Sequence, residues 1–522
     1  MVLFLKRSLR KLHDGIIRGK LVIVVGIISF ICTINLVLNT STNDFETYAT
    51  TNYNTERDWT FYRGCVDTHE YIQDNNYKKM NSTFVMLTRN EEIEDVLKTI
   101  NSIESHFNQW FQYPYVFINN EAFTTEFKNK VESMTSAKTE FGIINEMAWD
   151  FPEDIRNSEL FHQSIKDQGD RGILYGGIES YHKMCRFYSG LFYKHPLMKQ
   201  YEWYWRLEPN VEFYCDISYD PFFEMARNNK KYGFTIVIPE LVSTIPNLFR
   251  YTQAFIRNKK LKVGSLWKLF AVNRNILKTP NKDLSDFVNF EDDIQDKFSE
   301  QVAIDFLLTE NKDNSEGVRK LVQRARSKKP IVMNKFDNQE YNNCHFWSNF
   351  EIAKLDIFDN ELYDEYFRFL EKSGGFWRER WGDAPVHSLG LGLTLNVEDI
   401  HYFRDIGYRH ASISHCPKNF ISEDGRGQLP YKSVENRYFR TKKDSLFDKA
   451  IEEGSSCRCK CPTNDDVEDY SGICMYRWLE LTHADDSDVN FGRKSGGEYK
   501  PYIDSEQVYS DYREVFNGYR HI

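Results

Sequence analysis

The sequence predicts an α/β fold, and the segment from residue 82 to residue 119 carries that prediction. STFVML (82–87) is an uncharged run with the length of a buried strand, and YPYVFIN (113–119) has the same character. Between them, apolar residues recur at helical spacing from Ile93 to Ile103. Two strands joined by one helix usually pair in parallel, so ligand sites are expected at the carboxyl ends of the strands.

Two local signals add detail to this α/β pattern. Thr88 and Glu91 have the spacing of a capping box just before the apolar stripe, which predicts the start of the helix. Residues Trp203 to Leu207 are aromatic or apolar except for Arg206, which predicts a buried strand, and Pro209 cannot continue a central strand. A strand should therefore end close to Glu208.

Composition narrows the class of protein. The chain has 522 residues, enough for one large domain or two ordinary ones, and 15% of them are aromatic. So many aromatic residues argue against a disordered chain and supply side chains for a core and for stacking on carbohydrate. A net charge of −10 over this length argues against nucleic acid as a partner.

The amino terminus predicts a membrane anchor. Six basic residues within positions 1–20 precede an uncharged run from Leu21 to Leu38. A helix of that length spans roughly 27 Å, close to the roughly 30 Å of a bilayer core. A cleaved signal peptide is the alternative, but the run exceeds its roughly 7–15 apolar residues and no small-residue cleavage site follows. We expect a cytoplasmic tail (1–20), a signal-anchor transmembrane helix (21–38) and a lumenal remainder.

The lumenal part divides into a stem and a head. Residues 39–75 are polar and aperiodic, as expected of a stem, and residues 76–522 are expected to form one domain with an extended carboxy-terminal region. The tail beyond Cys416 is expected to be an irregular appendage. Two basic stretches, 257–262 and 318–330, are typical of solvated surfaces, with a face toward a membrane or an acceptor as the alternative.

The cysteines fit an oxidising compartment. Nine cysteines follow the anchor, and because nine is odd at least one thiol should be free or paired between chains. The three cysteines of CRCKC (457–461) lack the usual spacing of zinc ligands, so we expect disulfides there, with Cys474 as one candidate partner. Asn39 and Asn81 each begin a glycosylation sequon, and Asn81, farther from the membrane, is the predicted glycosylation site.

Three segments offer groups that could carry chemistry. Glu208, at a strand end before Pro209, could be a ligand for a hard divalent cation, or it could form a turn or a salt bridge with Arg206. HYFRDIGYRHASISHCP (401–417) offers histidines and an aspartate, which Mn²⁺ accepts as ligands, although single histidines are usually structural. Glu351 follows three nearby aromatic residues and could serve a sugar's anomeric carbon, or it could lie on the polar face of a helix.

Taken together, several blocks resemble the fungal α-1,2-mannosyltransferases of glycosyltransferase family fifteen. They include ESYHKMCRF and WRLEPN within 171–222, NNCHFWSNFEIA (342–353), RWGDAPVHSLGL (380–391) and HYFRDIGYRHASISHCP (401–417), in the order in which the family has them. With FVMLTRNEE (84–92) they cover most of residues 80 to 420. The resemblance implies a GT-A-like fold: a single large catalytic domain around a mixed, mainly parallel central sheet, preceded by an N-terminal transmembrane helix.

The resemblance also implies an activity and a location. It implies a type II Golgi membrane protein that transfers mannose from GDP-mannose with Mn²⁺ as cofactor and with retention of configuration. The implied acceptor is an α-mannoside on O-linked or N-linked glycans of a glycoprotein.

Two metal ligands are implied, and each lies beside a departure from the family pattern. Glu208 of the RLEP block is similar to the family's metal-ligand carboxylate, and His410 of GYRH is similar to its metal-binding imidazole. Many members have EPD where this chain has Glu208, a proline and Asn210, and a histidine is common where this chain has Arg409. If residue 210 helps to balance the charge of the metal, the affinity for Mn²⁺ should be lower here.

Four more residues are implied in the site. Glu351 of SNFE is similar to the family's proposed nucleophile, and Tyr181 of ESYHKMCRF is similar to an active-site tyrosine near donor and acceptor. Asp383 of GDAPVHS is expected to contact substrate, and Arg89 is expected to meet the guanosine diphosphate.

Two other functions stay open. The departures could mark a weakly active or inactive homologue that binds glycans or forms a complex in the Golgi. Glu208 and Glu351 could also be the carboxylate pair of a glycoside hydrolase, although the donor-type blocks have no role in hydrolysis.

Overall fold

The computed structural model describes residues 60–62, 65–273, 312–313, 335–336, 339–417, 456–459, 461 and 473–483. The chain divides into two units, residues 1–62 and 63–522, and the second contains the elements below. The predicted cytoplasmic tail and anchor (1–38) lie outside the described residues. Among the described residues, no helix is both long enough and apolar enough to cross a membrane.

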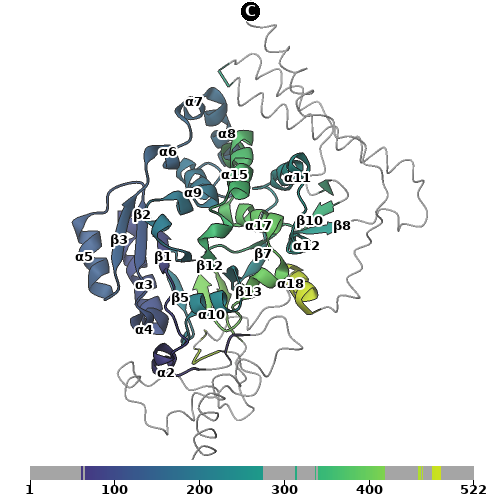
Figure 1. Cartoon of the computed structure of the whole chain (residues 1–522). Helices are drawn as coiled ribbons and strands as arrows, with labels where there is room; N and C mark the ends of the chain where they lie inside the picture. Colours follow the sequence, from purple (N-terminus) through teal and green to yellow (C-terminus); the bar gives the residue numbers. More distant parts are fainter. Residues whose placement is uncertain are drawn as a thin grey trace, which may run out of the picture. The chain divides into compact units, whose positions relative to one another are not determined.

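The fold is built on a seven-stranded sheet with the strand order β13-β6-β12-β4-β1-β2-β3 (Figure 1). Its strands are β1 (Ser82–Leu87), β2 (Tyr115–Asn119), β3 (Thr139–Ile143), β4 (Trp203–Arg206), β6 (Tyr232–Phe234), β12 (Glu351–Lys354) and β13 (Ile400–Tyr402). β1 pairs in parallel with β2 and β4, β2 with β3, and β6 with β13. β12 is antiparallel to both β4 and β6. The sheet is mixed and mainly parallel, as predicted.

Helices cover both faces of this sheet. One face carries Phe84 and Trp205, which pack on Phe107 of the π-helical segment η2 (Glu104–Asn108), directly after α3 (Ile93–Ile103). The other face carries Tyr204 and Arg206 and is covered by α9 (Glu179–Gly190) and α17 (Asp383–Thr394). The alternation of β4 therefore directs the tryptophans to one layer and the tyrosine and arginine to the other.

Three smaller sheets complete the strands. One has the order β15-β14-β5 and consists of β5 (Val211–Phe213), β14 (Tyr408–His410) and β15 (Ile413–His415). Another has the order β8-β10-β9, from β8 (Ala271–Asn273), β9 (Lys335–Phe336) and β10 (Gln339–Tyr341). The third pairs β7 (Val237–Pro239) with β11 (Cys344–Phe346).

The other described helices surround these sheets. The α-helices are α2 (Thr68–Gln73), α4 (Gln109–Phe111), α5 (Thr125–Met134), α6 (Glu146–Trp149), α7 (Glu153–Arg156), α8 (Glu159–Asp170), α10 (Pro221–Arg227), α11 (Leu248–Lys259), α12 (Trp267–Phe270), α15 (Glu361–Ser373), α16 (Gly375–Arg378) and α18 (Ile473–His483). The 3-10 turns are η1 (Asn90–Glu92), η3 (Phe192–Lys194), η4 (Met198–Gln200), η6 (Leu355–Ile357) and η7 (Val397–Asp399).

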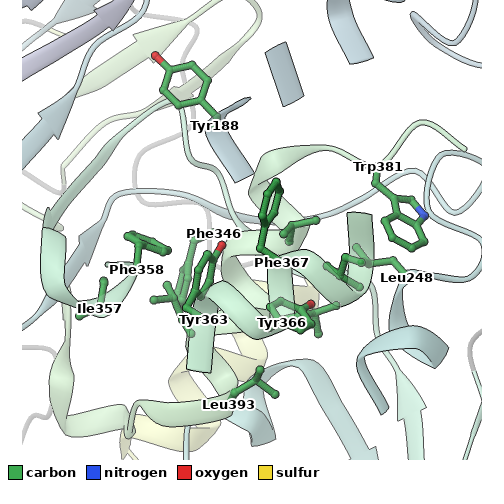
Figure 2. Close-up of a cluster of buried hydrophobic side chains, with 14 of the residues drawn as sticks. Tyr188, Leu248, Phe346, Ile357, Phe358, Tyr363, Tyr366, Phe367, Trp381 and Leu393 are labelled. Atoms are coloured by element: carbon green, nitrogen blue, oxygen red, sulfur yellow. The ribbon is translucent and has the colours of Figure 1, made fainter. Parts of the chain in front are cut away.

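The core on the α17 side is strongly aromatic. Figure 2 shows part of this cluster, which includes Phe346, Phe358, Tyr363, Tyr366, Phe367 and Trp381. Two glycines allow the close packing: a Cβ on Gly190 of α9 would lie 2.2 Å from the ring of Phe367, and one on Gly390 of α17 would lie 2.5 Å from the ring of Tyr363. The high aromatic content of the sequence is therefore largely core.

The opening strand, helix and strand are confirmed with small shifts. β1 has the predicted bounds, and β2 begins at Tyr115 rather than residue 113 because Pro114 has no N–H to donate to a ladder. The capping carboxylate is Glu92 and not Glu91. It accepts hydrogen bonds from the Arg89 N–H (2.9 Å) and the Thr88 hydroxyl (3.1 Å), because the turn η1 is inserted before α3.

Four disulfides join distant segments: Cys65–Cys457, Cys215–Cys459, Cys344–Cys474 and Cys416–Cys461. CRCKC thus forms disulfides as predicted, but Cys474 pairs with Cys344 and not within that motif. Among the described cysteines, the one free thiol is Cys185, which is buried in α9.

Both ends of the head differ from expectation. Within the predicted stem, Tyr71 of α2 is buried and donates to Glu224 (2.8 Å), so the folded part already includes residues before 76. Within the predicted irregular tail, α18 is a regular helix whose Trp478 is buried against Phe234 (5.0 Å between ring centroids). A helix with buried apolar residues belongs to the core and not to an appendage.

Candidate functional site at the carboxyl end of β4

The turn after β4 is fixed by α3. Asn210 has a φ of 62°, a left-handed conformation that asparagine tolerates better than most residues. The hydroxyl of Thr99 donates to the carbonyl of Glu208 (2.9 Å) and accepts from the N–H of Val211 (2.9 Å). The N–H of Asn210 donates to the carbonyl of Asp95 (3.0 Å). Glu208 is therefore held at the strand end by a turn whose backbone is pinned to a helix.

Arg206 lies at the centre of the site. Its guanidinium donates from Nε to Glu208 (2.7 Å) and from a terminal nitrogen to both Asp383 and the hydroxyl of Ser348 (3.3 Å for the latter). It also lies over the ring of Tyr188, 3.6 Å from the ring centroid. One buried cation thus joins a carboxylate at the end of β4 to another at the first residue of α17, where a negative charge is favoured by the helix dipole.

The pKa values of the two carboxylates beside Arg206 are shifted in opposite directions. Burial raises the pKa of Glu208, and the Arg206 charge only partly offsets that rise. Burial would also raise the pKa of Asp383, but the neighbouring Arg206 charge and the hydrogen bonds from Arg206 and Ser348 hold it below its ordinary value. Asp383 is therefore the firm partner of the guanidinium, and Glu208, whose side chain is 15% exposed, is the carboxylate open to another cation.

His410 is brought to the same place by strand pairing. β14 pairs with β5 so that His410 is opposite Val211, three residues after Glu208. Its Nδ1 lies 3.1 Å from the side-chain amide of Asn349, and its ring is tilted over Trp347. Burial and the nearby Arg206 charge lower the pKa of His410, which favours the neutral imidazole that a metal requires.

Glu351 is close to this site but covered. It is the cross-strand partner of Arg206, so both side chains lie on the same face of the sheet. Its carboxylate is fully buried and accepts hydrogen bonds from the hydroxyls of Tyr204 (2.8 Å) and Tyr232 (3.1 Å), with Nδ1 of His387 at 3.3 Å. Glu351 is in strand β12, which excludes the helix considered for it.

A second polar cluster continues from Asp383 toward α9. The ring of Tyr181 lies under the guanidinium of Arg380 (5.5 Å) and is stacked on Tyr175 (4.6 Å between ring centroids). Arg380 is 3.6 Å from Glu240, and its Nε is buried without a hydrogen-bond partner. Tyr175 has a φ of 58° and is 48% exposed, an unusual combination for an aromatic residue. The cluster offers an aromatic wall and the carboxylate of Glu240 to a polar ligand.

The remaining predicted residues lie farther out. Arg89, at the end of β1, is 67% exposed on its side chain and pairs with Glu92 (2.9 Å). The charge of Glu92 contributes to the raised pKa of Glu208, which places this pair near the rim of the site. Asn81 is exposed at the opposite end of β1, where its amide donates to the carbonyl of Gln200 (2.9 Å).

The other polar residues of 401–417 belong to the interior. His401 is buried in β13, Asp405 accepts from the hydroxyl of Tyr219 (2.8 Å), and His415 lies 3.1 Å from the carbonyl of Arg404. Of this segment, His410 is the member that strand pairing brings beside Glu208.

The donor set near Glu208 suits Mn²⁺ in chemistry and in charge. A carboxylate and a neutral imidazole are ligands that this cation accepts. The carboxylates of Glu208, Asp383 and Glu351 exceed the single positive charge of Arg206, which leaves negative charge for a cation to balance. Among the described residues, no group of three or more His, Cys, Asp or Glu side chains forms a metal site. A metal bound here would therefore need ligands from a substrate or from water.

The sequence did not indicate several residues that organise the site. Arg206 was considered only as a partner that might neutralise Glu208, whereas it also joins Asp383 across 177 positions. Ser348 and Asn349 were part of a matched block without an assigned role. An arginine inside an otherwise aromatic strand is the signal that could have identified Arg206, because a buried charge requires partners.

Known proteins resemble this chain over most of its length. A family model described as glycolipid 2-alpha-mannosyltransferase matches residues 37–442. The probable mannosyltransferase KTR7 of Saccharomyces cerevisiae is 53% identical over 475 residues, covering 89% of this chain and 88% of that protein. The O-glycoside alpha-1,2-mannosyltransferase homolog 4 of Schizosaccharomyces pombe is 40% identical and covers 81% of each chain.

Two solved structures have a similar fold. The core-mannan synthase A (CmsA/Ktr4) of Aspergillus fumigatus, in a Mn/GDP form, matches with a TM-score of 0.54 and 31% identity, over 78% of this chain and 87% of that one. The mannosyltransferase Ktr4p of Saccharomyces cerevisiae, in complex with GDP, matches with a TM-score of 0.51 and 31% identity, over 81% and 93%.

Proposed function

We infer that this chain, which belongs to the glycolipid 2-alpha-mannosyltransferase family, is an α-1,2-mannosyltransferase that uses GDP-mannose. The related structures hold GDP, and one of them holds Mn as well. The observation that carries the proposal in this chain is the position of Glu208 and His410, one at the end of β4 and one on the strand beside the same turn.

On the donor side, Glu208 and His410 would hold Mn²⁺, and Arg89 would meet the guanosine diphosphate. The metal, when bound, neutralises the charge of the departing diphosphate. If Nε2 of His410 is the ligand atom, Nδ1 carries the proton, so the amide of Asn349 would present its oxygen to it. Arg206 and Ser348 keep Asp383 ionised and in place beside the reacting groups.

On the acceptor side, Asp383 and Tyr181 would bind a terminal α-mannoside. Sugar hydroxyls would donate to the carboxylates of Asp383 and Glu240, whose side chains are 9% and 12% exposed. The aromatic pair of Tyr181 and Tyr175 provides a surface on which a sugar ring can stack. The acceptor proposed is therefore a mannosylated glycan on a glycoprotein, O-linked or N-linked.

Transfer with retention requires stabilisation of a positively charged anomeric centre. Glu351 supports this best as a fixed negative charge below the site, because its burial and three hydrogen-bonding neighbours leave it no open path to a sugar. Its predicted role as nucleophile would require a different side-chain position. The same burial disfavours a glycoside hydrolase with Glu208 and Glu351 as its pair, since one member of that pair must face water or substrate.

We also propose that the protein is a single-pass type II protein of the Golgi membrane with its catalytic domain in the lumen. The basic residues before the run from Leu21 to Leu38 support that orientation. The four disulfides are consistent with an oxidising lumen.

The test is a transfer assay on the purified full chain with GDP-mannose and α-methyl mannoside or mannobiose. Mannose transfer in Mn²⁺, its loss in EDTA, and an α-1,2 linkage in the product are expected. GDP with Mn²⁺ should also raise the unfolding temperature by mass action. Absence of turnover and of any thermal shift at saturating ligand would contradict the proposal and favour the glycan-binding or complex-forming subunit.

A further inference from the structure

His410 lies on a small sheet of three short strands. β5, β14 and β15 contribute three residues each, and β14 is the middle strand. His410 is the last residue of β14 and pairs with Ile413 across a two-residue turn in which Ala411 has a φ of 53°. So short a sheet gains little stability from its own hydrogen bonds, so the position of His410 depends on what holds the strands.

Both outer strands of this sheet are tied at the end away from Glu208. β5 runs from Val211 toward Cys215, and Cys215 is bonded to Cys459. β15 runs from Ile413 toward Cys416, and Cys416 is bonded to Cys461. Because Cys459 and Cys461 are separated by one residue, the two disulfides join the ends of β5 and β15 to each other across the middle strand.

The same carboxy-terminal segment is itself fixed to the head. The N–H of Asp216 donates to the carbonyl of Cys457 (2.9 Å), and Cys457 is bonded to Cys65. The carboxylate of Asp216 lies 2.9 Å from Nδ1 of His106 and 3.4 Å from a terminal nitrogen of Arg458. Asp216 and Cys457 are both buried, so this contact is a rigid attachment point.

We propose that residues 457–461 act as a clamp that positions His410 for the metal. The clamp holds β5 and β15 at one end, β14 lies between them, and His410 leaves the opposite end of β14 toward Glu208. The inference rests on the proposed function, because it assumes that Glu208 and His410 bind Mn²⁺. It gives a role in metal binding to a segment more than 45 residues after His410 in the sequence.

The test measures Mn²⁺ binding without turnover. The full chain is purified with saturating GDP, and free Mn²⁺ is followed by electron paramagnetic resonance during titration. In C416A/C461A, which removes one bond and leaves no stray thiol from it, we expect the Mn²⁺ Kd to rise by roughly tenfold, the scale seen when a ligand loses its supporting contacts. GDP affinity without metal should stay unchanged.

Two further variants distinguish an effect of the clamp on Mn²⁺ binding from a general loss of stability. C344A/C474A removes a disulfide that fastens α18 to β11 and does not involve the β15-β14-β5 sheet, so its Mn²⁺ Kd should match wild type. An insertion of one glycine on each side of Lys460 keeps all four bonds but loosens the link between Cys459 and Cys461. This insertion should weaken Mn²⁺ binding without removing any disulfide.

Each outcome either supports the clamp or overturns it. Weaker Mn²⁺ binding in the insertion variant, with C344A/C474A like wild type, supports the clamp even if C416A/C461A does not fold. Wild-type affinity in the insertion variant, or an equal loss in C344A/C474A, overturns it. If the wild-type chain itself takes up no Mn²⁺ with GDP, the metal site of the proposed function fails, and the clamp fails with it.

Discussion

Two glutamates lie on either side of Arg206, and their surroundings differ sharply. Glu208 has a side chain that is 15% exposed and meets the guanidinium at 2.7 Å, whereas Glu351 is fully buried among Tyr204, Tyr232 and His387. The first has coordination capacity left for a cation, and the second has used its oxygens within the core. The neighbours of each glutamate therefore determine its role: Glu208 is available to bind a cation, and Glu351 is a buried charge held by the core.

The largest effect is expected from Glu208→Gln. The amide keeps the shape but loses the charge that would hold the metal, so Mn²⁺-dependent transfer from GDP-mannose should fall by about a thousandfold. The unfolding temperature should change little, because the cost of burying the Glu208 carboxylate offsets much of what its ion pair with Arg206 contributes. Transfer rates with Mn²⁺ and circular dichroism measure the two properties. Full retained activity would remove Glu208 from the site.

Glu351→Gln is expected to lower both stability and transfer activity, because the charge of Glu351 serves the site and its oxygens accept hydrogen bonds in the core. Its amide would place a donor against the hydroxyls of Tyr204 and Tyr232, which already donate to this side chain, so the free energy of unfolding should drop by about 1–3 kcal/mol. Urea unfolding measures that loss. Tyr232→Phe is the matched control, since it removes one donor and should cost less. Full activity in a folded Glu351→Gln variant would contradict the role of Glu351 as a fixed negative charge for the site.

A smaller effect concerns pH and Asp383. Arg206 and the hydrogen bonds outweigh burial and keep the pKa of Asp383 below its ordinary value, so its contribution to stability is present above about pH 4 and is lost as the pH falls through the folded-state pKa. Between pH 6 and pH 3, the free energy of unfolding of D383N should therefore decrease less than that of the wild type. Both proteins are measured without metal or nucleotide. Parallel curves for the two proteins would contradict the pairing with Arg206.

The smallest effect is expected at the acceptor cluster. Tyr175→Ala removes the exposed ring stacked on Tyr181 and should raise the acceptor KM by roughly threefold. The KM for GDP-mannose should stay unchanged, because Tyr175 stacks on Tyr181, which lies under Arg380 and is assigned here to the acceptor. Initial rates with mannobiose as the varied substrate measure the change. An altered donor KM would show that the two sides of the site are not separate.

Local patterns predicted the elements that depend on neighbours in sequence. Strand β1, helix α3 and the end of β4 shortly before Pro209 follow from periodicity and from the missing proline N–H. The sequence left open whether Glu208 belongs to a turn or to a ligand site. The structure has the turn, with Asn210 in a left-handed conformation, and this turn fixes the position of Glu208.

Contacts between distant positions could not be predicted in this way. Nothing local indicates that Arg206 joins Asp383, that β12 enters the sheet antiparallel, or which cysteines pair, since four or more cysteines allow many connectivities. The displaced capping residue, Glu92, has a different cause, because the inserted 3-10 turn η1 has Arg89 as its N-cap, one position after the predicted Thr88. The tail helix α18 was missed because its apolar residues lie in a polar, tyrosine-rich region.

The bond between Cys65 and Cys457 has a consequence for biosynthesis. The two cysteines are 392 positions apart, so the amino-terminal partner emerges first and must wait for the carboxy-terminal one. At a synthesis rate of about 5–20 residues per second, that delay is roughly 20–80 s. During this interval Cys65 and Cys215 both lack their partners, and the newly made chain is open to mispairing. Pairing of the three cysteines in residues 457–461, together with Cys474, is therefore the step that gives the nascent chain its final covalent form.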